Sequence, residues 1–367
     1  MFRYILMILT ATNLYLYLKL RSGFGKGWWN VVYVSWAVAW AVLSFTTRGV
    51  FLQGSRYEEI LFSLSFTRAV LVVMACAFFL FMDMGSLTAR LIDRLAGTNY
   101  KARFFDPRKC VPVTLLLVLA VALYGYYEAW NVRRVDLVME TPKLPEEIDR
   151  LRLVHVTDTH LGSGLYTIDR FRRVMDIVRS AEPDILVLTG DIVDSRTSLL
   201  EEEAKLLSSH GAKYGAYAVL GNHEFYTGIE KAADFMKRSR VFLLRDASVD
   251  VAGITILGLD ERQSVRTLPN GLYFPEDRFV LFLIHRPHFI EGGEGKIDLQ
   301  LSGHTHGGQI WPLRYATQRA NNNVQHLSYK GTSAIYVSNG AGFFGPPLRF
   351  LMPPEVTVID LVKRRPI

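Results

Sequence analysis

Gly303-His304-Thr305-His306-Gly307-Gly308-Gln309 is the stretch from which the fold and chemistry of this chain can be inferred. It places two imidazoles one residue apart in a glycine-rich turn, directly after the apolar run 297–301, which predicts a β-strand. On its own, a His-x-His pair between glycines is as typical of a polar turn as of a metal site. The ends of other predicted strands favour the metal site.

Four further apolar runs end in side chains that can bind metal ions. The runs 151–156, 185–188, 216–220 and 279–284 read as strands. The polar residues that follow them are, in order, Asp158-Thr159-His160, Gly190-Asp191-Ile192-Val193-Asp194, Gly221-Asn222-His223-Glu224 and His285. Ligands of open α/β sheets bind outside the carboxyl ends of the strands, so these positions suit a binding site.

The order Asp-x-His, Gly-Asp-x-x-Asp, Gly-Asn-His-Glu, His, Gly-His-x-His resembles the calcineurin-like metallophosphoesterase superfamily, over roughly the C-terminal two-thirds of the chain. The form of the 303–309 stretch is similar to the bacterial membrane-associated branch of that family. Two downstream segments share that similarity: Tyr336-Val337-Ser338-Asn339-Gly340 and Pro347-Leu348-Arg349-Phe350. The resemblance implies an α/β fold, a layered β-sandwich flanked by helices.

The resemblance also implies a centre of two divalent or trivalent metal ions. The expected ligands of one metal are Asp158, His160 and His306, those of the other are Asn222, His285 and His304, and Asp191 is expected to bridge them. This donor set contains imidazoles, carboxylates and one amide but no thiolate, which suits manganese, iron or zinc. The expected reaction is metal-dependent hydrolysis of a phosphoester.

His223 resembles the family's catalytic histidine, which is not a ligand and donates a proton to the leaving oxygen or stabilises the transferring phosphoryl group. Either Glu224 or Asp194 could orient its ring. Arg286 and Arg349 are candidates for binding a substrate phosphate, with surface solvation as the alternative for each.

Half of the residues are hydrophobic and the mean hydropathy is +0.15, so a membrane portion is expected. The apolar runs 4–18, 28–45, 61–82 and 111–130 are each about long enough to cross a hydrocarbon core of roughly 30 Å, which predicts an all-α bundle of four transmembrane helices. The first run could instead be a cleaved signal peptide, but it lacks a small-x-small cleavage site. The net charge is +7, yet no nucleic-acid motif accompanies it, so no nucleic-acid partner is expected.

These patterns divide the chain into a transmembrane domain, 1–130, and a catalytic domain, 131–367. Helices are predicted at 167–181, 199–209 and 229–239, and a short surface helix within 90–109. Arg68 and Asp83 could form a relay pair in the third span, although positions near the membrane interface explain both. The basic residues of the first and third loops outnumber those of the second, which predicts a multi-pass membrane protein with its catalytic domain outside the cytoplasm.

The leading hypothesis is a membrane-anchored phosphoesterase that hydrolyses a phosphodiester or pyrophosphate of a lipid or envelope molecule. A pyrophosphohydrolase of UDP-2,3-diacylglucosamine in lipid A synthesis is an alternative that requires a cytoplasmic site. A non-catalytic scaffold with the same fold is another, although a complete ligand set argues against it. The loop 340–347 is predicted to place Phe343 and Phe344 against the membrane or an acyl chain, with burial of both rings in the core as the alternative.

Overall fold

The chain forms two units, Met1–Gly125 and Tyr126–Ile367. The computed structural model describes residues 2–46, 56–163, 166–194, 200–260, 267–268, 272–321 and 326–364. The last turn of the helix that ends at Trp130 therefore belongs to the second unit.

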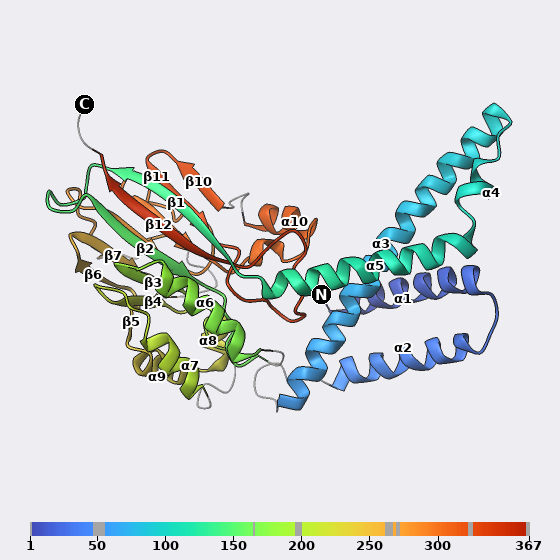
Figure 1. The fold of residues 1–367 in the computed structure, drawn as a ribbon, viewed down its shortest axis with the longest axis horizontal. Helices are drawn as coiled ribbons and strands as arrows, with labels where there is room; N and C mark the ends of the chain where they lie inside the picture. Colours follow the sequence, from blue (N-terminus) through green and yellow to red (C-terminus); the bar gives the residue numbers. More distant parts are fainter. Residues whose placement is uncertain are drawn as a thin grey trace. The chain divides into compact units, whose positions relative to one another are not determined.

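The first unit is helical. Its helices are α1 (Phe2–Phe24), α2 (Trp29–Thr46), α3 (Arg56–Ala96), α4 (Tyr100–Phe104) and α5 (Pro107–Trp130), drawn from blue to green in Figure 1. Among the described residues, Ser63–Ala96 and Pro107–Trp130 have the length and composition needed to cross a membrane. The expected bundle of four membrane-crossing helices thus stays a prediction.

The predicted surface helix within 90–109 differs from the structure. α3 runs on without a break through Leu87, Leu91 and Leu95 to Ala96, and only the short helix α4 follows. No proline interrupts α3, and Gly97, with φ +65°, supplies the left-handed residue that commonly ends a helix. The apolar spacing in this segment therefore belongs to the end of a long helix.

Arg68 and Asp83, two of the charged residues of α3, have separate partners. Arg68 donates to Asn13 Oδ1 at 2.6 Å and lies over the ring of Trp36, so it connects three helices. Asp83 accepts from the hydroxyl of Tyr15 at 2.7 Å and pairs with Lys19. These contacts tie neighbouring helices together, as interhelical polar contacts commonly do.

The second unit contains two six-stranded sheets (Figure 1). The first has the order β1 (Arg133–Thr141), β12 (Glu355–Lys363), β2 (Arg150–Val156), β3 (Ile185–Thr189), β4 (Ala216–Val219), β5 (Val241–Leu243). The second has the order β10 (His326–Lys330), β11 (Ser333–Val337), β9 (Leu299–Ser302), β8 (Val280–Leu283), β7 (Ile254–Gly258), β6 (Ala247–Val251). Strands β2 to β5 are parallel to one another, as are β7, β8, β9 and β11.

Alternation along β2 shows how the layers pack. Leu151 and Leu153 join an inter-sheet core with residues of β8 and β9, such as Leu281. Val154 and Val156 instead face a second core, built with α6 (Ile168–Ser180), α7 (Glu201–Ser208) and α9 (Ile229–Arg238). Because side chains alternate between the faces of a strand, one sheet serves both cores. The expected layered α/β fold with two sheets is confirmed for this unit.

Parallel strands in both sheets are followed at their carboxyl ends by the polar motifs. β2 leads to Asp158, β3 to Asp191, and β4 to α8 (Asn222–Thr227). In the second sheet, β8 leads to His285 and β9 to the turn that contains η3 (His306–Gly308). The remaining helix of the unit, α10 (Leu313–Ala320), follows that turn.

Candidate metal centre

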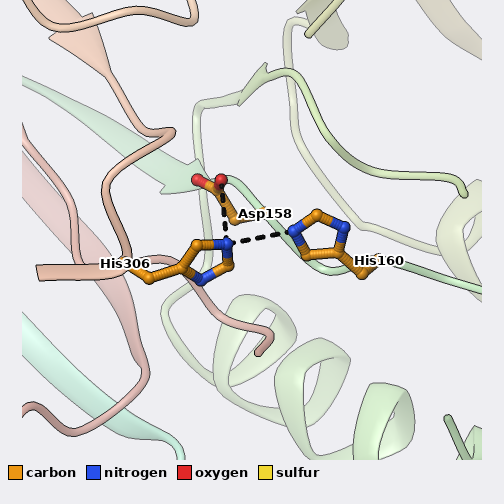
Figure 2. Close-up of side chains that lie close together, drawn as sticks. All are labelled: Asp158, His160 and His306. Atoms are coloured by element: carbon orange, nitrogen blue, oxygen red, sulfur yellow. Dashed lines mark hydrogen bonds and ion pairs between the residues drawn. The ribbon is translucent and has the colours of Figure 1, made fainter. Parts of the chain in front are cut away.

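Asp158, His160 and His306 come together although they lie far apart in the sequence. In Figure 2, Nε2 of His306 points to both partners, at 3.5 Å from Asp158 Oδ1 and 3.0 Å from His160 Nε2. All three side chains are buried, and each offers one donor atom within 4.8 Å of the others. This is the set expected to hold one metal.

A second cluster lies beside the first and consists of Asp191, His285 and His304. His285 Nε2 is 3.1 Å from Asp191 Oδ2 and 3.2 Å from His304 Nδ1. Asp191 also groups with His160 and His223 within the same 4.8 Å limit. Its carboxylate therefore reaches toward both clusters, as a bridging ligand must.

Asn222 provides a test of whether a metal fits here. Its Oδ1 is buried and has no hydrogen-bond partner among the residues that the structure describes. Buried polar atoms are rarely left unpaired, and a cation would satisfy this acceptor, whose chain neighbours Gly221 and His223 both lie against Asp191. The donor set and this acceptor together fit a centre of two metal ions.

Glycines provide room for the carboxylates. A Cβ on Gly221 would lie 2.2 Å from Asp191 Oδ1, and a Cβ on Gly303 would lie 2.2 Å from Asp158 Oδ2. Both glycines belong to the motifs seen in the sequence, and any side chain there would displace a candidate ligand.

Five of the expected ligands have left-handed backbone conformations. Their φ angles lie between 50° and 70°, at Asp158, His160, Asp191, His304 and His306. Such conformations are uncommon outside glycine, cost about 1–3 kcal/mol each and cluster at functional sites. The chain thus accepts backbone strain in order to point these side chains at one another.

Two imidazoles have a hydrogen-bond acceptor behind the ring, at the nitrogen that faces away from the cluster. His285 Nδ1 is 2.7 Å from the carbonyl oxygen of Thr189, and His160 Nδ1 is 2.9 Å from Asp194 Oδ1. His306 differs, because its Nδ1 lies 3.0 Å from the guanidinium of Arg349, a group that can only donate. The contacts of His285 and His160 with acceptor oxygens are of the kind that fixes the ring orientation of metal-binding histidines.

The structure shows which acidic residue contacts His223. Asp194 Oδ1 lies 2.5 Å from His223 Nδ1, whereas the Glu224 carboxylate accepts hydrogen bonds from the main-chain N–H groups of Asp191, Ile192, Val193 and Gly221. Asp194 therefore orients the ring, and Glu224 holds the backbone of the Asp191 turn. Burial alone would lower the pKa of His223, but the charge of Asp194 and its hydrogen bond outweigh burial and raise that pKa to about 9.

The pKa values of the two aspartates of the centre are shifted in opposite directions. Burial raises the pKa of Asp158, despite the nearby His285. Burial also acts on Asp191, but His285, together with His223 and His160, outweighs it and holds the pKa of Asp191 well below its usual range. Asp191 is therefore ionised at neutral pH and ready to attract a cation.

Arg349 and Arg286 occupy different environments. Arg349 is fully buried, and its donors reach main-chain carbonyls and His306, which does not fit the expected contact with a substrate phosphate. Arg286 is half-buried and follows His285. Burial is the main cause that lowers the pKa of His304 to about 3, and the charges of His285 and Arg286 lower it further. Arg286 thus stays a candidate for binding phosphate.

The two phenylalanines of the 340–347 loop also differ. Phe343 is buried, under the guanidinium of Arg170 and against the edge of Trp130, so the expectation that it engages lipid is wrong. The ring of Phe344 is half-buried, 5.5 Å from that of His223 and 6.0 Å from that of His160. Phe344 therefore lies beside the centre.

Tyr226 is a neighbour of the centre that the sequence motifs did not identify. Its ring lies 5.6 Å from that of His223, and its side chain is exposed. The two residues are three positions apart on α8, a spacing that places side chains on one helix face. A helix prediction for 222–227 would have revealed this contact.

Comparisons with known proteins agree with this site. The family model for the calcineurin-like phosphoesterase domain matches residues 151–308. An uncharacterized metallophosphoesterase of Aquifex aeolicus is 30% identical over 260 residues, which cover 67% of this chain and 98% of the relative. One from Campylobacter jejuni is 28% identical over 97% of this chain and 96% of its own length.

Two further similarities come from an animal protein and a solved structure. A transmembrane protein with metallophosphoesterase domain from Danio rerio is 28% identical, over 79% of this chain and 71% of the relative. The crystal structure of a 5'-nucleotidase precursor from Thermus thermophilus aligns with a TM-score of 0.34 and 16% identity, over 58% of this chain and 54% of that chain. Taken with the identity to the Aquifex aeolicus relative over nearly its whole length, the motif order shows that this chain belongs to the calcineurin-like phosphoesterases, a family of phosphoester hydrolases that use two divalent metal ions.

Proposed function

We propose that the protein is a membrane-anchored phosphoesterase that hydrolyses a phosphodiester or pyrophosphate, in a lipid or other envelope molecule. The observation that carries this proposal is the position of Asp191, which lies between two ligand clusters and beside His223. A shared carboxylate between two clusters suits a pair of metal ions, and the adjacent imidazole supplies an acid.

The proposed ligands follow from the two clusters. Asp158, His160 and His306 would hold one metal, Asn222, His285 and His304 would hold the other, and Asp191 would be shared between them. When bound, such ions neutralise the phosphoryl oxygens and activate water for attack. Manganese is the ion with which we expect activity to be found first, because imidazole, carboxylate and amide donors suit it.

His223 acts as the general acid in this proposal. Asp194 holds its Nδ1, and its Nε2 lies 3.9 Å from Asp191 Oδ2, on the side of the ligands. With its pKa raised to about 9 by Asp194 against the effect of burial, the imidazole carries a proton at neutral pH. It can give this proton to the leaving oxygen of the substrate.

The surroundings of His223 favour a substrate whose leaving group is apolar. The rings of Phe344 and Tyr226 both contact it edge-on, and Tyr226 is exposed. Aromatic rings beside the general acid provide an apolar surface for the ester group that leaves. Two helices with the length and composition needed to cross a membrane, Ser63–Ala96 and Pro107–Trp130, support a substrate that lies in a bilayer.

The proposed anchor is a bundle of α1, α2, α3 and α5, with the catalytic unit on the extracytoplasmic face. Lys19, Arg21 and Lys26, with the basic residues of 90–109, outnumber Arg3, Arg48 and Arg56 on the opposite side, although Arg133 and Arg134 reduce the difference. Periplasmic and cytoplasmic reporters fused after Trp130 test this topology. A reporter that is active only in the cytoplasm would reverse it and favour the UDP-2,3-diacylglucosamine alternative.

The activity is tested with the full chain in detergent and an aryl phosphodiester. We expect turnover only with manganese or a similar divalent ion, and loss of both turnover and manganese binding in Asp191→Ala and His304→Ala. His326→Ala, an imidazole on the edge strand β10, is the matched control and should retain both. Full turnover after exhaustive chelation, or in either ligand variant, would contradict the proposal.

A further inference from the structure

Arg349 is a buried guanidinium whose hydrogen bonds go to main-chain carbonyls. Nη1 donates to the carbonyl oxygen of His306 at 2.7 Å, and Nη2 donates to those of Asn339 at 2.9 Å and Gly342 at 2.5 Å. Nε donates to Gly342 as well, at 3.2 Å. A buried charge costs free energy unless it is well hydrogen-bonded, so these hydrogen bonds are needed to keep Arg349 in its buried position.

The carbonyls that Arg349 joins belong to two segments that form the metal centre. One is the turn of His306, and the other is the loop 339–342 after β11. The loop packs directly on the first aspartate: a Cβ on Gly342 would lie 1.9 Å from the main-chain oxygen of Asp158, and one on Gly340 would lie 2.8 Å from its Cβ. Arg349 therefore spans the backbone behind both Asp158 and His306.

Arg349 also contacts the ring of His306. Its Nη2 lies 3.0 Å from Nδ1, while Nε2 of the same ring faces Asp158 and His160. A single planar group thus holds the carbonyl of His306 and lies beside its ring, which fixes the backbone from which the ring extends. A lysine could not reproduce this fork, because its ammonium is a single point of donation.

A second buried guanidinium, that of Arg170 on α6, also donates to the loop 339–342. It donates to the carbonyl oxygens of Ala341 at 2.6 Å and Ala129 at 3.2 Å, and it lies over the ring of Phe343. Arg170 resembles Arg349 in burial, in charge and in contact with this loop. Their contacts differ at His306, which makes Arg170 a matched control.

We propose that Arg349 is a positioning residue that sets the orientation of His306 and the spacing between His306 and Asp158 in the metal centre. This inference rests on the proposed function. It predicts that the guanidinium matters for the occupancy of one metal position more than for the stability of the fold. Its contacts reach two of the three ligands of that position, His306 directly and Asp158 through the loop 339–342.

Manganese binding to the full chain in detergent tests this role. We compare the wild type, Arg349→Lys and Arg170→Lys by equilibrium dialysis and by the electron paramagnetic resonance signal of an exchange-coupled manganese pair. The wild type is expected to bind two ions. Arg349→Lys is expected to bind one of them at least about tenfold more weakly and to lose the coupled signal. Removing a group that supports a metal ligand commonly weakens metal binding by about this factor. Arg170→Lys is expected to retain two ions, whatever its melting temperature.

Each outcome separates this inference from the proposal beneath it. A wild type that binds no manganese pair overturns the proposed centre itself. A wild type and Arg349→Lys that bind two ions equally well overturn only the role of Arg349. Equal weakening in Arg349→Lys and Arg170→Lys also overturns it, since the loop would then be responsible. If circular dichroism shows that Arg349→Lys is unfolded, Arg349→Gln, whose amide can still donate to one carbonyl, takes its place in the same comparison.

Discussion

The side-chain amide of Gln309 pairs with the main chain of Phe344: its Oε1 accepts from the N–H at 2.9 Å and its Nε2 donates to the carbonyl at 3.0 Å. This two-way pairing connects the end of the Gly-His-Thr-His-Gly-Gly-Gln stretch to the loop that lies beside His223. The last residue of the motif thus places an aromatic ring against the proposed general acid.

Gln309→Ala should therefore affect both stability and turnover. It leaves two half-buried main-chain groups without their partner, which should cost about 1–3 kcal/mol and lower the melting temperature by several degrees. It should also lower kcat/KM, because Phe344 is no longer held beside His223. Gln318→Ala, on the outer helix α10, is the control, and unchanged kcat/KM in Gln309→Ala would contradict the link to catalysis.

Alanine substitutions of Phe343 and Phe344 should differ in their effects on stability and turnover. Phe343 is buried, so Phe343→Ala should destabilise the protein by about 3–5 kcal/mol. Phe344→Ala should change the melting temperature less and reduce turnover more, with the larger loss on a vesicle-embedded diester than on a soluble one. Equal losses on both substrates would show that the ring does not contact the apolar part of a substrate.

Asp194→Asn should shift the pH dependence of kcat/KM. The charge of Asp194 raises the pKa of His223 against the effect of burial, so its removal lowers that pKa. An acid must be protonated, and the rate falls as pH rises through its pKa. The alkaline fall should therefore begin about one pH unit or more lower than in the wild type. Asp176→Asn, exposed on α6, is the control, and superimposable profiles for Asp194→Asn would argue against His223 as the acid.

His155 should make stability depend on pH without taking part in catalysis. It is fully buried in β2, with Nε2 2.7 Å from Thr189 Oγ1, and burial lowers its pKa to about 3. In the unfolded chain His155 takes up a proton as pH falls through about 6.5, whereas in the folded chain it stays neutral until about pH 3. Its contribution to the free energy of unfolding is therefore fully present above pH 6.5 and is lost as pH falls toward 3. Between pH 7 and pH 5, unfolding measurements should show His155→Gln gaining about 2 kcal/mol relative to the wild type. Parallel unfolding curves at the two pH values would contradict this.

Much of the centre could be predicted because its residues lie in short motifs at strand ends. Apolar runs identified β2, β3, β4, β8 and β9, and the polar residues after them are those that the structure brings together. Parallel strands place their carboxyl ends at one edge of a sheet, so local sequence was sufficient to identify these positions.

Other features depend on tertiary contacts that the local sequence does not contain. Arg349 is a charged residue in a proline-containing loop, which is typical of an exposed residue. In the structure it is buried, because its guanidinium donates to carbonyl oxygens of segments far away in the sequence, such as that of His306. Phe343 and Phe344 are neighbours in a segment without periodicity, so no pattern distinguishes the buried ring from the one beside His223. Asp194 and Glu224 were equivalent as acidic neighbours until their distances to His223 were known.

The last turn of α5 determines where a soluble catalytic fragment has to start. Ala129 in this turn accepts from Arg170, Trp130 contributes its carbonyl to Arg173 and its ring edge to Phe343, and Glu128 pairs with Arg133. A fragment that begins at residue 131 would leave a buried guanidinium without one of its acceptors and open an apolar gap beside the loop of the metal centre. Expression of a water-soluble enzyme for crystallography should therefore begin at Tyr126, with the exposed rings of Tyr126 and Tyr127 replaced by polar residues.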